Sequence, residues 1–564
     1  MRFALAQLNP IVGNLKYNAE KILSACKAAN QQNANIVLTS ELSLWGYPPK
    51  DLLLNPYALN YQKIILDEIA ESLFSEAPNL SLLIGIIDQS NDLQVPSLFN
   101  SVAIVKEGGW EVIARKQLLP TYDIFDEARY FRSGKDNGII TLQTAGKALR
   151  VGITICEDLW VEGDIQTERT LGDDPIAKLT SERIDLLVNI SASPFSVSKE
   201  SIRQRVAKKA SIRLNCPIVY LNQVGGNDEL VFDGSSFILN NKGELILSLP
   251  SCEEALTIWD SNSTKTTCIS SASSSYEKIF KSLVLGVKDY ASKCGFKSAT
   301  LGLSGGIDSA LVTTIAVAAL GKANINPILM PSPWSSTGSI NDSVGLANRL
   351  GISTKTIPIE SLMQSFDYAL TEVLGGKPQG VTAENLQSRI RGALLMAIAN
   401  TENHLLLSTG NKSELAVGYC TLYGDMNGGL SVIGDLFKTN VFELCKWIDS
   451  EESFSCREKM GLISNGEIIG TSILQKPPSA ELQPDQLDSD SLPAYPTLDR
   501  ILKAIIDDNI PIQALIEKGE DPILINRISL LIKNAEFKRR QAPPLLKVSK
   551  QAFGSGWRRP IATT

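Results

Sequence analysis

The sequence predicts an α/β protein with more than one domain. Its 564 residues are too many for one hydrophobic core, and at roughly 150 residues per domain about two to four domains are expected. Short, nearly continuous apolar runs alternate with segments of helical periodicity, which is typical of sheets that helices cover on both faces. The hydrophobic share of 43% and the charged share of 20% are ordinary for a globular chain.

The first half of the chain, residues 1–260, supplies most of these strand-like runs. They lie at residues 36–38, 82–87, 102–105, 151–155 and 186–190. Residues 61–74 have the apolar spacing of a helix instead. Alternation of this kind predicts an α/β layered domain over residues 1–260.

A change in composition separates this half from the next. Residues 261–275 are dominated by serine and threonine, as linkers are. A helix is expected to begin near Tyr276, and strands are expected at 300–303 and 328–330. Residues 276–564 are therefore predicted to form a second α/β domain.

The overall composition of the chain indicates which kinds of partner it binds and in which cellular compartment it acts. The net charge of -7 argues against nucleic acid, because phosphate binding requires a basic face. Nine scattered cysteines without a CxxC pair fit a reducing cytoplasm better than a disulfide framework. The apolar run in residues 1–8 is too short for a signal peptide, and no apolar stretch approaches the roughly 18 residues of a membrane span. A cytoplasmic protein that acts on small molecules is expected.

A candidate nucleophile stands at the end of one predicted strand. Cys156 follows the run 151–155, and active-site residues of α/β folds collect at such strand ends. A thiol reacts as the thiolate, so a neighbouring group must take its proton. The chain has a single histidine, His404, in the other half, which excludes cysteine–histidine catalysis within the first half.

A carboxylate and a lysine can replace the missing histidine. The carboxylate takes the thiol proton, and the ammonium stabilises the developing oxyanion. Glu41 and Lys116 are candidates, because each follows a strand-like segment. Taken singly, a buried structural thiol and two solvated charges are the more usual explanation of such residues.

Together, the three residues resemble the Glu-Lys-Cys triad of the nitrilase family. The matching contexts are Ser-Glu-Leu-Ser-Leu-Trp around Glu41, Arg-Lys-Gln-Leu-Leu-Pro around Lys116 and Ile-Cys-Glu-Asp-Leu-Trp around Cys156. The resemblance covers roughly residues 1–260. It implies a four-layer αββα sandwich that hydrolyses carbon–nitrogen bonds through a thioester.

The glutamine-hydrolysing branch of that family implies further site residues. The positions that match Tyr122, Ser193 and Lys199 contact glutamine there, and Glu127 and Glu157 match acidic positions around the triad. Without the resemblance, Ser193 would equally be a turn residue before a proline.

The second half contains a strand, a glycine-rich loop and a helix in succession. Glycines let backbone amides approach an anion closely, and the N-terminus of the following helix adds partial positive charge. Asp308 in the loop is placed to bind a magnesium ion that bridges phosphates. The loop is not a Walker A motif, because no lysine completes it.

Two other interpretations of this loop stay open from the residues alone. Gly302, Ser304 and Gly306 also fit the GxSxG nucleophile elbow of α/β-hydrolases, for which His404 would be the only available base. The loop could also be a glycine turn capped by a serine.

The string Ser-Gly-Gly-Ile-Asp-Ser resembles the pyrophosphate-binding loop of the N-type ATP pyrophosphatases. That resemblance implies a doubly wound parallel sheet of Rossmann-like type, in which ATP adenylates a carboxylate and releases pyrophosphate. The implied ATP-binding residues are Gly302, Leu303, Ser304, Gly305, Gly306, Ile307, Asp308 and Ser309.

Other motifs in this half are similar to those of NAD synthetases. In Thr-Gly-Asn-Lys-Ser-Glu, Thr409 matches an ATP contact and Glu414 matches a residue that binds deamido-NAD and the metal. Asn385 and Lys538 match deamido-NAD contacts, and segment 434–439 resembles the family's lysine segment. The implied metal is Mg²⁺, held by Asp308 and Glu414.

Over nearly the whole chain, the two halves resemble the glutamine-dependent NAD synthetases. This implies ATP-dependent amidation of deamido-NAD with ammonia from L-glutamine, in a homo-oligomer built on synthetase-domain dimers. Three alternatives remain: another acid as acceptor, a first half without catalytic activity, or an amidase with an unrelated C-terminal binding domain.

Overall fold

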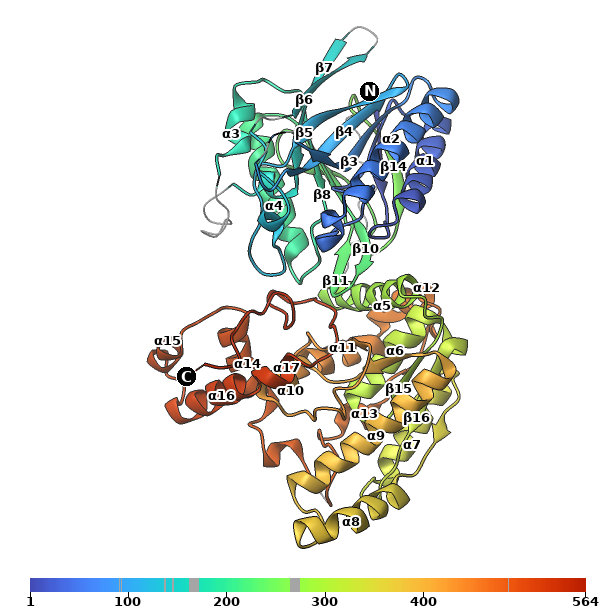
Figure 1. Ribbon diagram of the computed structural model, residues 1–564, viewed down its shortest axis with the longest axis vertical. Helices are drawn as coiled ribbons and strands as arrows, with labels where there is room; N and C mark the ends of the chain where they lie inside the picture. Colours follow the sequence, from blue (N-terminus) through green and yellow to red (C-terminus); the bar gives the residue numbers. More distant parts are fainter. Residues whose placement is uncertain are drawn as a thin grey trace. The chain divides into compact units, whose positions relative to one another are not determined.

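The computed structural model describes residues 1–90, 92, 94–135, 138–144, 147–161, 172–263, 274–484 and 486–563. The chain divides into two compact units, Met1–Ser273 and Ser274–Thr564, which Figure 1 colours from blue to green and from green to red. Most of the linker expected at 261–275 falls on residues 264–273, outside the described residues. No described helix is both long and apolar enough to cross a membrane.

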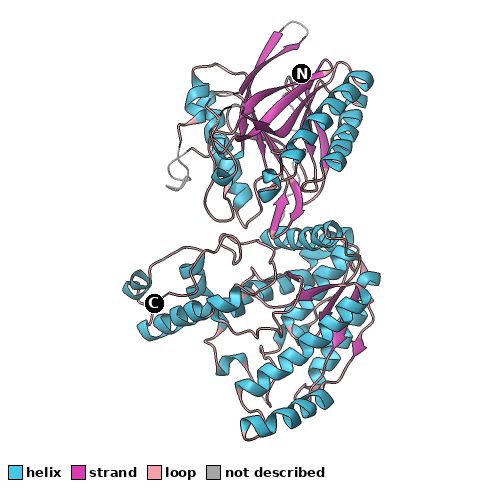
Figure 2. Ribbon diagram, viewed as in Figure 1, coloured by secondary structure: helices cyan, strands magenta, loops and turns pink. Residues whose placement is uncertain are grey.

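Two six-stranded sheets form the centre of the first unit (Figure 2). In order, the first sheet contains β14 (Ala255–Asp260), β1 (Arg2–Gln7), β2 (Ile36–Leu38), β3 (Ser81–Gln89), β4 (Leu98–Lys106) and β5 (Gly109–Arg115). The second contains β13 (Leu245–Ser248), β12 (Phe237–Leu239), β9 (Ile218–Asn222), β8 (Leu186–Ser191), β7 (Lys147–Ile155) and β6 (Gly138–Thr144).

Helices cover the outer face of each sheet. Residues of α1 (Leu15–Gln31) and α2 (Pro56–Glu76) share one core with the first sheet, and residues of α3 (Pro175–Thr180) and α4 (Lys199–Leu214) share another with the second. A third core lies between the sheets and contains residues of both. The predicted four-layer αββα sandwich is therefore confirmed.

Strand β1 shows why the apolar runs are continuous. Phe3 and Leu5 pack in the core between the sheets, whereas Ala4 and Ala6 pack in the core beneath the helices. Successive side chains of a strand point to opposite faces, so a strand buried on both faces needs apolar residues at every position.

The second unit is built on a five-stranded parallel sheet. Its order is β17 (Lys355–Thr356), β16 (Ile325–Leu329), β15 (Ala299–Gly302), β18 (Leu405–Ser408) and β19 (Leu430–Ser431). The chain first adds strands on one side of β15 and then on the other. The predicted doubly wound sheet is thus confirmed, and ligands of such sheets bind where the strand order reverses, outside the carboxyl ends of the strands.

Helices α6 (Ile307–Leu320) and α9 (Val381–Glu402) flank that point. Helix α6 packs on β15 and β16, and α9 packs on β15 and β18. A separate helical core contains residues of α10 (Lys412–Val417), α14 (Tyr495–Ile506) and α16 (Pro522–Asn534).

Candidate functional site

The first candidate site lies where strands of both sheets end. Glu41 follows β2, Lys116 follows β5 and Cys156 follows β7. Lys116 Nζ lies 2.7 Å from Glu41 Oε1, and the Glu41 and Lys116 side chains are buried. The charges of both act on the buried Cys156 thiol, so the fold brings the three predicted residues together.

Hydrogen bonds fix the carboxylate of Glu41 on both oxygens. Asn100 Nδ2 donates to Oε1 at 2.7 Å, and the backbone N–H of Ala192 donates to Oε2 at 2.8 Å. A carboxylate held in this way keeps one orientation without having to reorganise during a reaction.

Lys116 lies between two carboxylates. Its Nζ is also 2.7 Å from Oε1 of Glu127, which accepts a further hydrogen bond from Tyr47 Oη at 2.8 Å. Burial alone would lower the pKa of Lys116, but Glu127 and Glu41 raise it well above its usual value, so the lysine stays charged. Burial also raises the pKa of Glu127 to about 7, with Lys116 opposing the shift.

The surroundings of Cys156 disfavour the thiolate form of its side chain. Burial raises the pKa of the Cys156 thiol well above its usual value, the Glu41 carboxylate raises it further and Lys116 lowers it. A thiol in such surroundings becomes nucleophilic only when a nearby base takes its proton. The backbone of Cys156 has a φ of 46°, in the left-handed region that residues other than glycine rarely adopt and that is typical of strained active-site positions.

The predicted glutamine-binding residues lie around this site. Tyr122 Oη donates to Glu157 Oε1 at 2.8 Å. Burial raises the pKa of Glu157, and the positive charge of Lys199 opposes that shift. Lys199 Nζ also lies 4.2 Å from the ring centroid of Trp160.

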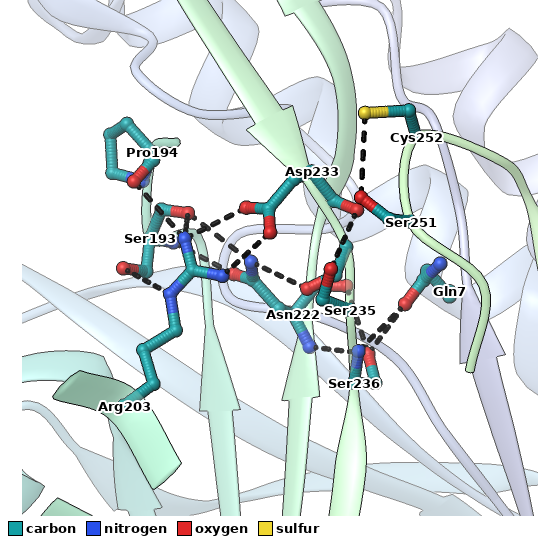
Figure 3. Close-up of polar contacts among 11 residues, drawn as sticks. Gln7, Ser193, Pro194, Arg203, Asn222, Asp233, Ser235, Ser236, Ser251 and Cys252 are labelled. Carbon is teal, nitrogen blue, oxygen red and sulfur yellow. Dashed lines mark hydrogen bonds and ion pairs between the residues drawn. The ribbon is translucent and has the colours of Figure 1, made fainter. Parts of the chain in front are cut away.

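Ser193 lies beyond the end of β8 in a buried polar network (Figure 3). Its N–H donates to Asn222 Oδ1 at 2.8 Å, and its Oγ accepts from Arg203 Nε at 3.1 Å.

The sequence did not single out Asn100, Tyr47 or the Ala192 amide. Asn100 had a usable signal, because it and Ser101 are polar residues in the buried part of strand β4. The Ala192 amide had none, since any residue supplies a backbone N–H.

The second candidate site is a cavity of about 770 Å³ in the second unit, at the reversal of strand order. Its lining includes seven of the eight predicted loop residues from Gly302 to Ser309, together with Thr409, Asn385, Glu414 and Lys538. Gly305 is absent from the lining, but its φ of 79° and a backbone carbonyl 2.2 Å from where a Cβ would lie both require glycine there.

Two carboxylates and a lysine meet beside the glycine loop. Lys438 Nζ pairs with Asp308 Oδ2 and lies 3.8 Å from Glu414 Oε1. Asn411 Nδ2 donates to Asp308 Oδ1 at 3.0 Å. Burial raises the pKa of Glu414 to about 8, and the negative charge of Asp308 raises it further while Lys438 lowers it.

This pair of carboxylates fits the magnesium ion that the sequence implied. Mg²⁺ prefers oxygen ligands and is usually held by one or two carboxylates, with water and substrate phosphates completing its shell. Both side chains offer oxygen ligands, and a cation bound there would favour the ionised form of Glu414, whose pKa burial and Asp308 raise. No group of three or more potential His, Cys, Asp or Glu ligands occurs among the described residues, so the other ligands would have to come from substrate and water.

The other two predicted substrate-binding residues form hydrogen bonds with a side-chain hydroxyl group and with backbone carbonyl groups. Asn385 Oδ1 accepts from Thr421 Oγ1 at 2.8 Å. Lys538 Nζ donates to the carbonyls of Gly418 and Cys420, at 2.7 Å each.

Two further cations also line the cavity. Lys476 forms an ion pair with Asp342, and Arg391 Nε donates to the carbonyl of Met330 at 3.1 Å. Burial lowers the pKa of Arg391 to about 10. Cations in a glycine-lined cavity suit phosphate-bearing ligands.

The nucleophile-elbow interpretation of the glycine loop does not hold. Ser304 lies beyond the carboxyl end of β15, whereas His404 immediately precedes the neighbouring parallel strand β18. Because the strands are parallel, the serine and the histidine lie at opposite edges of the sheet.

Comparisons with known proteins match each half to one family model. Residues 2–267 match the carbon-nitrogen hydrolase model, and residues 279–542 match the NAD synthase model. Glutamine-dependent NAD(+) synthetases of Synechocystis sp. and Acinetobacter baylyi are 47% and 38% identical to this chain, each covering 99% of it and 98% of the relative. A solved structure of the glutamine-dependent NAD+ synthetase from Acinetobacter baumannii, in complex with ADP, has a TM-score of 0.75 and 36% identity over 99% of this chain and 98% of its own.

Proposed function

The chain belongs to the glutamine-dependent NAD(+) synthetases, glutamine-hydrolysing ligases, and we propose that its two units divide the reaction between the two sites described above. The first unit releases ammonia from L-glutamine at Cys156. The second uses ATP to activate deamido-NAD and joins the ammonia to it. The observation that carries this proposal is the buried cluster of Glu41, Lys116 and Cys156 on the same chain as the glycine-lined cavity.

In the glutaminase reaction, Glu41 takes the proton of Cys156 as the sulfur attacks the amide carbon of glutamine. Lys116 stabilises the oxyanion of the tetrahedral intermediate, and the proton passes to the departing ammonia. Water then hydrolyses the thioester and releases glutamate. The raised pKa of the Cys156 thiol supports this order of events, because a base then has to take the proton as the sulfur attacks.

Glutamine binds in this proposal through Tyr122, Ser193 and Lys199. A free amino acid carries one carboxylate and one ammonium group, so its site needs a charge of each sign. Lys199 and Glu157 interact and supply such a pair, and Glu157 directly follows Cys156 in the chain.

In the synthetase reaction, the carboxylate of deamido-NAD attacks the α-phosphorus of ATP. Pyrophosphate leaves, ammonia attacks the acyl-adenylate, and NAD and AMP are formed. The backbone amides of residues 302–309 and Thr409 bind ATP, and Asn385, Glu414 and Lys538 bind deamido-NAD. The cations around the cavity support this assignment, because both substrates carry phosphates.

Mg²⁺ would be held by Asp308 and Glu414. When bound, it supplies positive charge against the phosphate oxygens of ATP. Lys438 pairs with Asp308 and lies near Glu414, so it holds the two carboxylates close to each other.

We further propose that the enzyme is a homo-oligomer built on synthetase-domain dimers. None of the 15 residues of α8 (Glu360–Leu374), all of them described, is buried. The helix nevertheless exposes large apolar side chains, among them Tyr368 at 89% and Val373 at 80%. Apolar side chains grouped on one helix are typical of a protein interface, and a second copy of the chain is the partner we propose. A cytoplasmic location follows from the use of ATP and a free catalytic thiol.

The test is NAD formation from deamido-NAD, ATP and magnesium, with either glutamine or ammonium as nitrogen source. We expect Cys156→Ala to abolish the glutamine-dependent reaction and to retain the ammonium-dependent one. The matched control is Cys216→Ala, which removes a second buried cysteine of the same unit and should retain both reactions. If wild type forms no NAD from either nitrogen source, deamido-NAD is not the acceptor.

A further inference from the structure

Arg203, a buried residue of α4, holds the segment that follows β8 (Figure 3). Its Nε donates to Ser193 Oγ at 3.1 Å. One terminal nitrogen donates to the carbonyls of Ser193 and Pro194, at 2.9 and 3.1 Å. A single guanidinium therefore fixes the side chain of Ser193 and two consecutive carbonyl groups.

Asp233 fixes the guanidinium in turn. Its two carboxylate oxygens accept from the two terminal nitrogens of Arg203 at 2.8 and 3.1 Å, a bidentate pairing that sets the plane of the guanidinium. The Arg203 and Asp233 side chains are 0% and 2% exposed. Asp233 ends β11 (Leu230–Asp233), so the pair ties α4 to a strand outside both six-stranded sheets.

Asn222 holds the other side of the same segment. Its Oδ1 accepts from the Ser193 N–H at 2.8 Å, and its Nδ2 donates to the Ser193 carbonyl at 3.2 Å. Ser193 is thus held through its backbone N–H, its carbonyl and its hydroxyl.

This segment reaches the catalytic carboxylate directly. Ala192, next to Ser193 in the chain, donates its backbone N–H to Glu41 Oε2 at 2.8 Å. A shift of Ser193 is transmitted to that amide, because only the two backbone dihedral angles of Ala192 separate the two N–H groups and the buried Ala192 has little room to absorb the change.

We propose that Arg203 is a positioning residue of the glutaminase site, where, clamped by Asp233, it holds Ala192 against Glu41 and Ser193 toward glutamine. This inference rests on the function proposed above. Among the described contacts, Arg203 forms no hydrogen bond or ion pair with Cys156, so it would act through Ser193 and Ala192.

A buried ion pair by itself is weak evidence of stabilisation, because well-packed apolar side chains of similar volume often do as well. The contribution of the Arg203 guanidinium is instead to hold its partners in a fixed arrangement. A lysine at this position could not reproduce the contacts, since its ammonium is a point charge that cannot span Ser193, Pro194 and Asp233 in one plane. Displacement of the segment by a fraction of an ångström is then expected in Arg203→Lys.

The test compares Arg203→Lys with Arg213→Lys in the full-length enzyme. Arg213 lies on the same helix and pairs with Asp174 at 2.6 Å, away from the site residues. For Arg203→Lys we expect KM for glutamine to rise about tenfold and glutamine-dependent kcat to fall by a similar factor, as misplaced catalytic groups cause. Ammonium-dependent synthesis should change less than twofold in both variants.

The KM for glutamine distinguishes a positioning role of Arg203 from a purely structural one. Partial unfolding lowers the concentration of active enzyme and hence the apparent kcat, but it leaves KM unchanged. An unchanged KM for glutamine in Arg203→Lys would overturn the proposal. If that variant does not fold, Asp233→Asn provides the test, because asparagine has the shape of Asp233 but not its charge. The KM for glutamine should rise in this variant as well. A wild type unable to use glutamine would instead contradict the proposed function, whatever the variants do.

Discussion

Nζ of Lys116 lies 2.7 Å from Oε1 of Glu41, and the two side chains are 1% and 0% exposed. Each residue follows a strand of the same sheet, but β3 and β4 lie between those strands, so the two side chains meet beyond the strand ends. The lysine is shared with Glu127, which makes it a single cation between two buried carboxylates. Loss of this cation should therefore affect both chemistry and stability.

Lys116→Met should lower glutamine-dependent NAD formation by about 100-fold to 1000-fold, because the oxyanion loses its stabilising charge. It should also destabilise the first unit by about 3–5 kcal/mol, since two buried carboxylates lose their partner. The measurements are steady-state kinetics and denaturant unfolding. Adding Glu127→Gln should restore part of the stability and none of the activity; a double variant as active as wild type would refute the assigned role.

The pH dependence of thiol alkylation tests the raised pKa of Cys156. Only the thiolate reacts, so a pKa raised by burial and by Glu41 leaves little reactive thiolate at pH 7. Without glutamine, alkylation of Cys156 by iodoacetamide should rise steadily from pH 7 to pH 9. Peptide mass spectrometry can follow Cys156 and the exposed Cys294 in the same sample. A plateau for Cys156 below pH 8 would mean that Lys116 stabilises a thiolate in the resting enzyme.

Lys438→Met should abolish synthesis with both nitrogen sources, because Asp308 and Glu414 lose the cation that pairs with them. Glutamine hydrolysis, measured as glutamate release, should persist. Lys446→Met is the matched control: this exposed lysine lies on the same helix, α11 (Lys438–Asp449), and pairs only with a neighbouring surface glutamate among the described contacts. If Lys438→Met synthesised NAD from ammonium at the wild-type rate, Lys438 would have no role in the synthetase site.

The double substitution Tyr368→Asp and Val373→Asp should dissociate the proposed synthetase-domain dimer, because charges would then lie at an apolar contact. Light scattering after gel filtration gives the mass. Tyr57→Asp, at a tyrosine of the first unit that is 82% exposed, should leave the mass unchanged. If the double variant retains the wild-type mass, α8 is not the interface.

Much of the fold could be predicted from local patterns. Strands buried on both faces need apolar residues at every position, so runs such as 186–190 predicted β8 directly. The glycine loop after β15 could also be predicted from the sequence. Its glycines mark a backbone that other residues do not fit, as the structure shows at Gly305.

The sequence by itself determined which chemical groups the chain carries: a thiol with no histidine in its half of the chain, a glycine loop after a strand, and carboxylates and lysines at strand ends. Only the tertiary structure decided which of these groups meet. Arg203 reaches Ser193 and Asp233, and Lys438 reaches Asp308 across 130 positions of the chain. Local periodicity reports burial and secondary structure, because neighbours in sequence create it. Contacts between distant side chains depend on how whole layers pack, and no local pattern contains that information.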